Sequence, residues 1–335
     1  MKKKQTVTIY DVAREAQVSM ATVSRVVNHN HNVKPATEKK VMEVVKRLNY
    51  RPNDVARGLA SKKTTTVGVI IPNVTNSYFA ALARGIDDIA EMYQYNIILT
   101  NSDGDEKKEV KALNTLYSKQ VDGIIFMGNE LSPAVRDEFK EERIPVVLAG
   151  SVDPQNDFPN VNIDYQQAVH SQVNELVKTG NQRIAFVAGD LKRAINQAFR
   201  LPGYREALQE HNLPFVADLL FEATDYDDGY ELCDKLLAQQ ATAAMVSNDD
   251  AAAGIMNGMN DRGVNVPEQF EIATSDNTKI TEMTRPTLST ITQPLYDVGA
   301  VSMRLLTKLM DNDDVEQKQV LLPFGMKQRG STKSA

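Results

Sequence analysis

Short apolar stripes at helical spacing mark the first 50 residues of the chain. The first stripe, Ile9 to Ala16, follows Thr8 as a capping residue, with Asp11 at capping-box spacing. The second stripe, at Val23, Val26 and Val27, follows a tight turn at Gln17-Val18 and has Ser19 as its cap. Pro35 opens a third stripe at the first-turn position that proline favours. Two short helices braced by a third predict a helix-turn-helix over residues 1–52.

From Thr66 onward, strand-like apolar runs alternate with helical patterns. The runs cover residues 67–71, 96–100, 123–127, 145–149, 183–187, 243–247 and 271–274. Continuous apolar strands separated by helices predict parallel sheets that helices cover on both faces. Seven such units exceed one compact sheet, so we expect an α/β core with two lobes that face a cleft. Ligands of such sheets bind beyond the carboxyl ends of the strands.

Charge divides the chain at the same place. Residues 1–63 contain fourteen Lys and Arg against five Asp and Glu, a formal charge of +9, whereas the remaining residues carry −15. A basic head on an acidic body is typical of a DNA-binding domain attached to a domain with another task. A solvated basic face is the alternative that charge alone leaves open.

The composition narrows the class of protein. The chain begins without an apolar signal sequence and has no run of roughly 18 apolar residues, so we expect a cytoplasmic, nucleoid-associated protein without a membrane span. The four histidines show no metal-ligand spacing, and the single Cys233 lies in a helical apolar pattern that indicates core. We therefore expect no enzyme, no metal and no cofactor. Asp249 and Asp276 could form a carboxylate pair, but polar residues at strand ends more often bind ligand or cap helices.

The second helix is the predicted recognition helix. Its outward face consists of Ser19, Met20, Ala21, Thr22, Ser24 and Arg25. Short side chains permit close approach to base edges in the major groove, and an arginine that reaches O6 and N7 of guanine is the commonest specific contact. We assign that contact to Arg25.

Two blocks carry a family resemblance. Residues 8–16 and 18–28 resemble the head of the lactose/galactose repressor family, and residues 50–60 resemble its hinge. The resemblance runs through the whole chain. Gln17 stands where that family usually has a turn glycine, which costs a fraction of a kcal/mol if the residue needs a positive φ.

The resemblance implies a hinge over residues 53–65 that folds into a helix on operator DNA. Leu59, with Ala56 beside it, would then wedge into the minor groove and kink the duplex. The alternative is a plain amphipathic linker. The predicted DNA-binding set is completed by Thr8, Tyr10, Asn28, Asn53 and Arg57.

For residues 66–335 the resemblance implies a core of the periplasmic-binding-protein type with three crossovers between its lobes. The expected N-lobe covers about 66–163 plus 294–320, and the C-lobe about 164–293 plus 321–335. Small-effector positions fall on Tyr78, Phe79, Arg200, Asp249 and Asp276. For Arg200 the alternative is an exposed helix charge. A sugar phosphate is a possible adjunct effector.

Further blocks, above all residues 293–310, resemble a subgroup of that family from low-GC Gram-positive bacteria. This resemblance implies a protein corepressor, HPr phosphorylated on a serine, which docks on one helix from each lobe. The first helix carries Ala81, Arg84, Asp87, Asp88 and Tyr93, and the second carries Tyr296, Asp297, Ala300, Val301, Arg304, Thr307 and Lys308. Arg304 and Lys308 form an i, i+4 cationic pair that suits phosphoserine. The alternative is that Arg304 pairs with Asp297 or Asp88 on a solvated face.

The sequence thus predicts a homodimeric regulator of carbon catabolite control that binds double-stranded operator DNA, with affinity raised by serine-phosphorylated HPr. A sugar-responsive repressor of the same family is the alternative. A periplasmic sugar receptor is disfavoured by the basic head and the missing signal peptide.

Overall fold

The computed structural model describes residues 7–27, 33–51, 63–128, 131–142 and 144–334, in two compact units that divide between Thr64 and Thr65. Within this described part, no helix is long and apolar enough to cross a membrane. The predicted positions Asn28, Asn53, Ala56, Arg57 and Leu59 lie outside the described residues.

The first unit is the expected three-helix head, built from α1 (Ile9–Ala16), α2 (Met20–Val27) and α3 (Pro35–Leu48). The Thr8 N–H and hydroxyl both donate to the Asp11 carboxylate, at 3.0 and 2.8 Å, which fixes the start of α1. Gln17 ends α1 in the left-handed region at φ 51°, so this residue does occupy the strained turn position. The core is a cluster of small apolar side chains in which Val12, Val23 and Val41 are completely buried.

The first lobe of the second unit contains a six-stranded parallel sheet in the order β11-β5-β4-β3-β1-β2. Its strands are β1 (Thr66–Ile71), β2 (Asn96–Asn101), β3 (Gly123–Phe126), β4 (Val146–Ala149), β5 (Asn160–Asn162) and β11 (Gln319–Leu321). On one face lie α5 (Ser77–Met92) and α14 (Leu295–Met310), and on the other α6 (Glu106–Ser118) and α7 (Pro133–Glu141). Alternate residues of one strand serve the two faces: Val69 packs toward α5 and Ile70 toward α6.

The second lobe repeats this plan with the strand order β12-β10-β9-β8-β6-β7. Its strands are β6 (Ile184–Ala188), β7 (Leu220–Glu222), β8 (Ala243–Val246), β9 (Glu271–Thr274), β10 (Ser289–Thr292) and β12 (Gly325–Lys327). One face is covered by α8 (Tyr165–Lys178) and α9 (Leu201–Glu210), the other by α10 (Tyr226–Glu231), α11 (Cys233–Ala238) and α12 (Asp249–Asp261); α13 (Ile280–Met283) follows β9. The predicted parallel sheet has one exception here, because β12 is antiparallel to β10.

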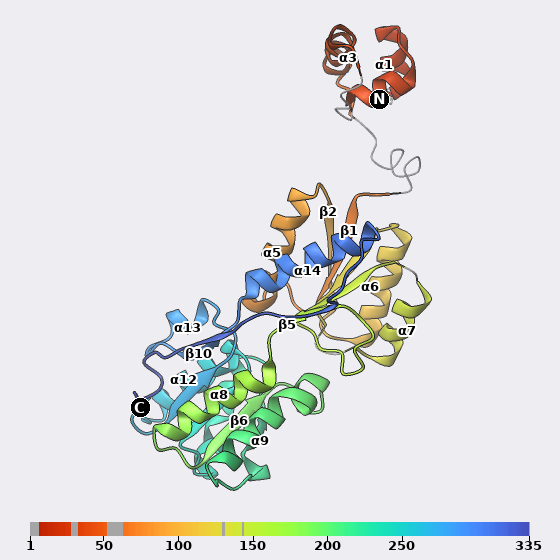
Figure 1. Cartoon of the computed structure of the whole chain (residues 1–335). Coiled ribbons are helices and arrows are strands. Elements are labelled where there is room, and N and C mark those ends of the chain that lie inside the picture. Colours follow the sequence, from red (N-terminus) through yellow and green to blue (C-terminus); the bar gives the residue numbers. More distant parts are fainter. Residues whose placement is uncertain (1–6, 28–32, 52–62, 129–130, 143, 335) are drawn as a thin grey trace. The chain divides into compact units, whose positions relative to one another are not determined.

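The chain passes from one lobe to the other three times, after β5, after β10 and after β11 (Figure 1). All seven predicted strands are present, so the two-lobed α/β core is confirmed. Cys233 lies in the core, where burial raises the pKa of its thiol to about 11, which makes the residue a structural apolar group rather than a nucleophile.

Helices α5 and α14 lie side by side, although some 200 residues separate them along the chain (Figure 1). Two glycines permit this approach. A Cβ at Gly85 would lie 2.0 Å from the Tyr296 carbonyl oxygen, and a Cβ at Gly299 would lie 2.0 Å from that of Leu82. Each helix therefore needs a glycine where the backbone of the other passes.

Replacement of Gly85 by alanine is expected to destabilise the core unit by about 1–3 kcal/mol, because the added methyl group forces the two helices apart. Calorimetry of the full chain should show a melting temperature lowered by several degrees. The control is Gly189→Ala, where the Cβ would find only the Thr224 methyl group at 3.7 Å. Equal melting temperatures for the two variants would contradict the close packing.

Candidate functional site

The residues of the second helix that were predicted to face DNA lie on the outer side of α2. Met20, Ala21 and Arg25 are exposed, whereas Thr22 and Ser24 are half-buried. The Thr22 N–H donates to the Ser19 hydroxyl at 3.2 Å, so Ser19 caps the helix as expected. Arg25 projects from the last turn of α2 with no ion pair to any described residue. Its guanidinium remains available for a guanine edge.

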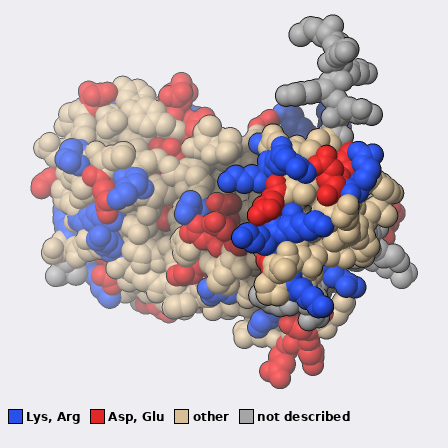
Figure 2. Space-filling view, turned by 90° about the horizontal axis from the view of Figure 1, so that it is seen from above, with Lys and Arg blue, Asp and Glu red and all other residues tan. Residues whose placement is uncertain are grey.

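Tyr10 adds a second exposed element to this surface, with 66% of its area accessible. Thr8 is also exposed, although its hydroxyl is already bonded to Asp11. In the space-filling view of Figure 2, blue Lys and Arg side chains are interspersed with red Asp and Glu side chains over the face shown. The excess of Lys and Arg in residues 1–63 agrees with a polyanionic partner.

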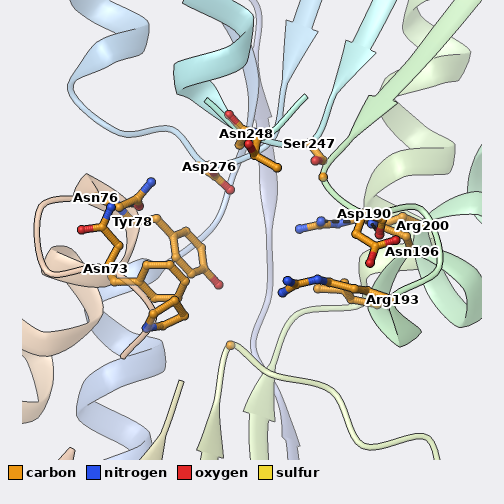
Figure 3. A pocket seen from close by; sticks show the side chains of 16 residues that line it. Asn73, Asn76, Tyr78, Asp190, Arg193, Asn196, Arg200, Ser247, Asn248 and Asp276 are labelled. Atoms are coloured by element: carbon orange, nitrogen blue, oxygen red, sulfur yellow. Dashed lines mark hydrogen bonds between the residues drawn. The ribbon is translucent and has the colours of Figure 1, made fainter. Parts of the chain in front are cut away.

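A cavity of about 300 Å³ lies in the cleft between the lobes of the core. Figure 3 shows Asn73, Asn76 and Tyr78 on one side and Asp190, Arg193, Asn196 and Arg200 on the other, with Asp276 between them. The positions come from the carboxyl ends of strands, as the topology requires. The lining is completed by Pro72, Phe79, Gly150, Gly189, Ile195, Thr224, Ser247 and Asn248.

Arg200 is held in place from two directions. Its guanidinium lies 5.4 Å from the centre of the Tyr165 ring, and its Nη1 donates to Asn196 at 3.4 Å. The residue belongs to a π-helical turn, Asn196–Arg200, that directly precedes α9. Such turns occur frequently at functional sites. The structure therefore places Arg200 in the cavity wall, in contrast to the alternative of an exposed helix charge.

Asp276 is the buried carboxylate of the cavity. Its side chain accepts from Gln293 Nε2 at 3.3 Å. Burial and the nearby Asp249 charge hold the pKa of Asp276 well above its usual range, while Arg200 acts in the opposite direction. Burial, with smaller contributions from Tyr165 and Asp276, likewise raises the pKa of the Tyr78 hydroxyl. The cavity therefore offers hydrogen-bonding groups beside the side chains of Arg193 and Arg200.

Asp249 does not line this cavity. Its two oxygens accept hydrogen bonds from the Thr274 hydroxyl at 2.8 Å and from the Thr278 N–H and hydroxyl at 2.7 and 2.8 Å. The residue is 1% exposed. The structure thus gives Asp249 a role inside the lobe, tying α12 to the loop after β9, and not the predicted contact with an effector.

The lining residues that the predicted effector set did not include contain three with polar side chains that face the cavity from near strand ends: Asn76, Arg193 and Asn196. Asn76 caps α5 and also donates across the cleft to Asp250 at 3.2 Å. Arg193 and Asn196 lie in the irregular segment after β6, where no apolar period marks which side chains point inward. The only available signal was their place just beyond a strand end.

The residues predicted to dock the corepressor lie on the neighbouring helices α5 and α14. Their arrangement differs from the expectation in the lobe to which the helices belong and in which residues are exposed. Both α5 and α14 pack on the same face of the first sheet, so both helices belong to one lobe and the expectation of one helix per lobe is wrong. Ala300 and Thr307 are 3% and 5% exposed, because that side of α14 faces the core. These two residues therefore support the surface from below. Ala81 and Val301 are partly buried against the same core.

The exposed side of this surface has an uneven charge distribution. Asp88 is engaged twice, by the Arg84 guanidinium at 2.6 Å and by the Tyr296 hydroxyl at 3.1 Å. The hydrogen bond to Asp88 raises the pKa of Tyr296. Within the described residues, no carboxylate lies within ion-pair distance of Arg304 or Lys308. The predicted alternative, a pair between Arg304 and Asp88 or Asp297, is therefore absent from this structure. Asp87, Tyr93 and Asp297 are exposed nearby.

Asp276→Asn is expected to stabilise the core increasingly as the pH rises. A carboxyl whose pKa is raised by folding favours the folded state below its unfolded-state pKa, and this contribution is lost as the pH rises through the folded-state pKa. Asparagine cannot ionise and still accepts from Gln293. Calorimetry should show similar melting temperatures for Asp276→Asn and the parent protein near pH 4. At pH 8 the melting temperature of the variant should be higher than that of the parent by roughly 2 °C or more. Asp297→Asn, at an exposed position, is the control and should keep the melting temperature of the parent protein. If the melting temperature of Asp276→Asn rose by the same amount at both pH values, this account would be refuted.

Comparisons with known proteins assign both units of the chain to the same family. Residues 8–53 match the bacterial regulatory proteins of the lacI family, and residues 64–308 match the periplasmic binding proteins and sugar binding domain of the LacI family. Catabolite control protein A of Streptococcus mutans is 55% identical over 99% of this chain and 100% of its own. The protein of the same name from Priestia megaterium is 53% identical over 98% and 99% of the two chains.

Solved structures give the same result. The crystal structure of the transcription regulator CcpA of Lactococcus lactis is 50% identical, with a TM-score of 0.78 over 80% of this chain and 99% of that one. The lac repressor dimer bound to operator and an anti-inducer is 26% identical, with a TM-score of 0.89 over 98% and 100% of the chains. The relatives are named as regulators and not as enzymes. The chain therefore belongs to the LacI family and is a DNA-binding transcriptional regulator of catabolite control.

Proposed function

We propose that the chain acts as a homodimer on operator DNA and that serine-phosphorylated HPr docks on the α5–α14 surface and raises operator affinity. The observation that carries this proposal is that Arg304 and Lys308 have no ion-pair partner among the described residues, while Asp88 on the same surface is already engaged by Arg84 and Tyr296. A phosphoserine carries nearly two negative charges and three acceptor oxygens, and an arginine fork suits it geometrically.

The remainder of the surface is suited to a protein partner. Tyr296 is 45% exposed and Tyr93 43% exposed, so two aromatic rings flank the charged groups. Aromatic and arginine side chains are the residue types that contribute most to protein interfaces. Burial of Ala300 and Thr307 keeps the backbone of α14 fixed, so the cations are presented from a rigid helix.

Dimerisation is supported by an apolar face on the same lobe. Strand β2 is an edge strand of its sheet, and it exposes 41% of Leu99. A groove of about 470 Å³ between β2 and α5 is lined by Val74, Ala80, Ala83, Ile97 and Leu99, among others. An exposed apolar edge strand is a natural place for pairing with a second copy. The relative seen on operator DNA is itself a dimer.

A small effector is the second candidate signal, and the cleft favours a sugar phosphate. Arg193 and Arg200 face the cavity together with asparagine side chains and Asp276 (Figure 3). Arginines bind phosphate, while amide and carboxyl groups hydrogen-bond to hydroxyl groups. This ligand would act as an adjunct to the phosphoprotein.

Arg304→Ala is expected to remove the response to phosphorylated HPr while leaving basal operator binding unchanged. Operator affinity is measured by fluorescence anisotropy with and without the phosphoprotein, in the absence of sugars. The change should cost about 1.5–3 kcal/mol of the coupling, because the arginine contact is charge-assisted. Arg205→Ala, an exposed arginine on α9 of the other lobe, should keep the full response. The proposal would be overturned if phosphorylated HPr raised the operator affinity of Arg304→Ala as much as that of the parent protein, or if it did not raise the affinity of the parent. A rise in operator affinity with a sugar phosphate alone would favour the small-effector candidate.

Arg25→Ala is expected to weaken binding to operator by about 1–3 kcal/mol while leaving affinity for unrelated duplex nearly unchanged, because a bidentate guanine contact discriminates between bases. Lys46→Ala, on the exposed side of α3, is the control and should not change the ratio of the two affinities. Proportional weakening on both DNAs in Arg25→Ala would assign this residue to the phosphate backbone.

A further inference from the structure

Two helices begin at the cleft from opposite lobes. In the first lobe α5 has Asn76 as its N-cap, and in the second lobe Asp250 lies in the first turn of α12. Asn76 Nδ2 donates to Asp250 Oδ2 at 3.2 Å, although the two residues are 174 positions apart in the chain. Figure 3 shows Asn76 on the first-lobe side of the cavity that it lines. This hydrogen bond therefore joins the lobes across the cleft, in addition to the three chain connections.

The orientation of the Asn76 amide is fixed by its second hydrogen bond. Its Oδ1 accepts the Tyr78 N–H at 2.9 Å and so caps α5. A flipped amide would turn its NH2 group toward the Tyr78 N–H and lose the cap, because both groups are donors. The NH2 group of the capping amide therefore points across the cleft, toward Asp250.

Asp250 needs a donor at this place. Its side chain is half-buried, and burial, followed by the charges of Asp249 and Asp225, raises the pKa of its carboxyl. No Lys or Arg among the described residues forms an ion pair with it. The N-terminus of α12 favours its negative charge, and the Asn76 amide supplies the donor. A single bond from a neutral amide can be broken more easily than a bidentate pair with arginine.

The position of this bond connects two parts of the core. Asn76 lines the cleft cavity, and it also caps the helix that carries Arg84 and Asp88. A ligand that enters through a wider cleft than the unliganded protein has must first separate Asn76 from Asp250. The same step releases the N-terminal end of α5 from the second lobe.

We propose that Asn76 and Asp250 form a latch that keeps the cleft closed while it is empty and opens to admit a small ligand. The strength of the latch sets the fraction of molecules with an open cleft, because a closed molecule keeps this hydrogen bond and an open molecule loses it. The latch depends neither on the identity of the ligand nor on the phosphoprotein proposed above.

The test measures the distance between the lobes in the full chain without ligand. Nitroxide labels are attached at Lys107→Cys and Lys192→Cys, two exposed positions that follow the carboxyl ends of β2 and β6 in the two lobes. The natural Cys233 is completely buried and is not labelled. Labelled chain is mixed with an excess of unlabelled chain, so that double electron–electron resonance measures distances within one chain.

Asn76→Ser should lengthen the mean distance by more than about 2 Å, because serine still caps α5 but is too short to reach Asp250. Asn76→Asp should lengthen it as well, since the new carboxylate also caps α5 but faces Asp250 with a like charge. Combining Asn76→Asp with Asp250→Asn exchanges the donor and the acceptor, and this exchanged pair should restore the distance of the parent protein.

Asp227→Asn is the control, because it removes an exposed carboxylate from the first turn of α10 and leaves both partners of the latch in place. It should keep the distance of the parent protein. An unchanged distance in Asn76→Ser, or a longer distance that persists in the exchanged pair, would disprove the latch. Equal lengthening in Asp227→Asn and Asn76→Ser would disprove it too, since opening would then not depend on this hydrogen bond.

Discussion

The close approach of α5 and α14 is the constraint on which the first lobe depends. Gly85 and Gly299 let the two backbones touch, and this contact joins a segment near the start of the core to one near its end. Because the helices cannot slide past each other without a clash, their exposed sides form a single rigid surface. The Asp88 cluster and the cations Arg304 and Lys308 on that surface owe their spacing to the glycines beneath them.

Seven strands could be predicted from sequence because each lies in an apolar run. The structure adds β5, β7, β10, β11 and β12, which have three or four residues each. These added strands lack such a run, and β5, with the sequence Asn-Val-Asn, is mostly polar. The antiparallel β12 depends on where the chain returns after leaving the first lobe, which no local pattern records.

The residues of the candidate sites also fall into those that could be predicted from sequence and those that could not. The recognition helix was predictable, because caps, turn and apolar stripe all lie within one short segment. On α14 the spacing of Tyr296, Ala300 and Arg304 indicated one face, but Ala300 is covered by a helix from a distant part of the chain. Arg193 could not be selected, since its inward direction is set by an irregular turn. Local sequence therefore specified elements, while tertiary packing decided which side chains remain accessible.

Three separate chain segments connect the two lobes of the core, and they follow β5, β10 and β11. A single connection would allow bending, twisting and sliding in any combination, whereas three connections at different positions remove most of these freedoms. Rotation of the lobes as rigid bodies is the motion that such connections leave easiest. The hydrogen bond between Asn76 and Asp250 spans the cleft at 3.2 Å, so a rotation that opened the cleft would have to break it. A rotation of this kind would displace the start of β1 more than the cavity itself, because displacement grows with distance from the axis.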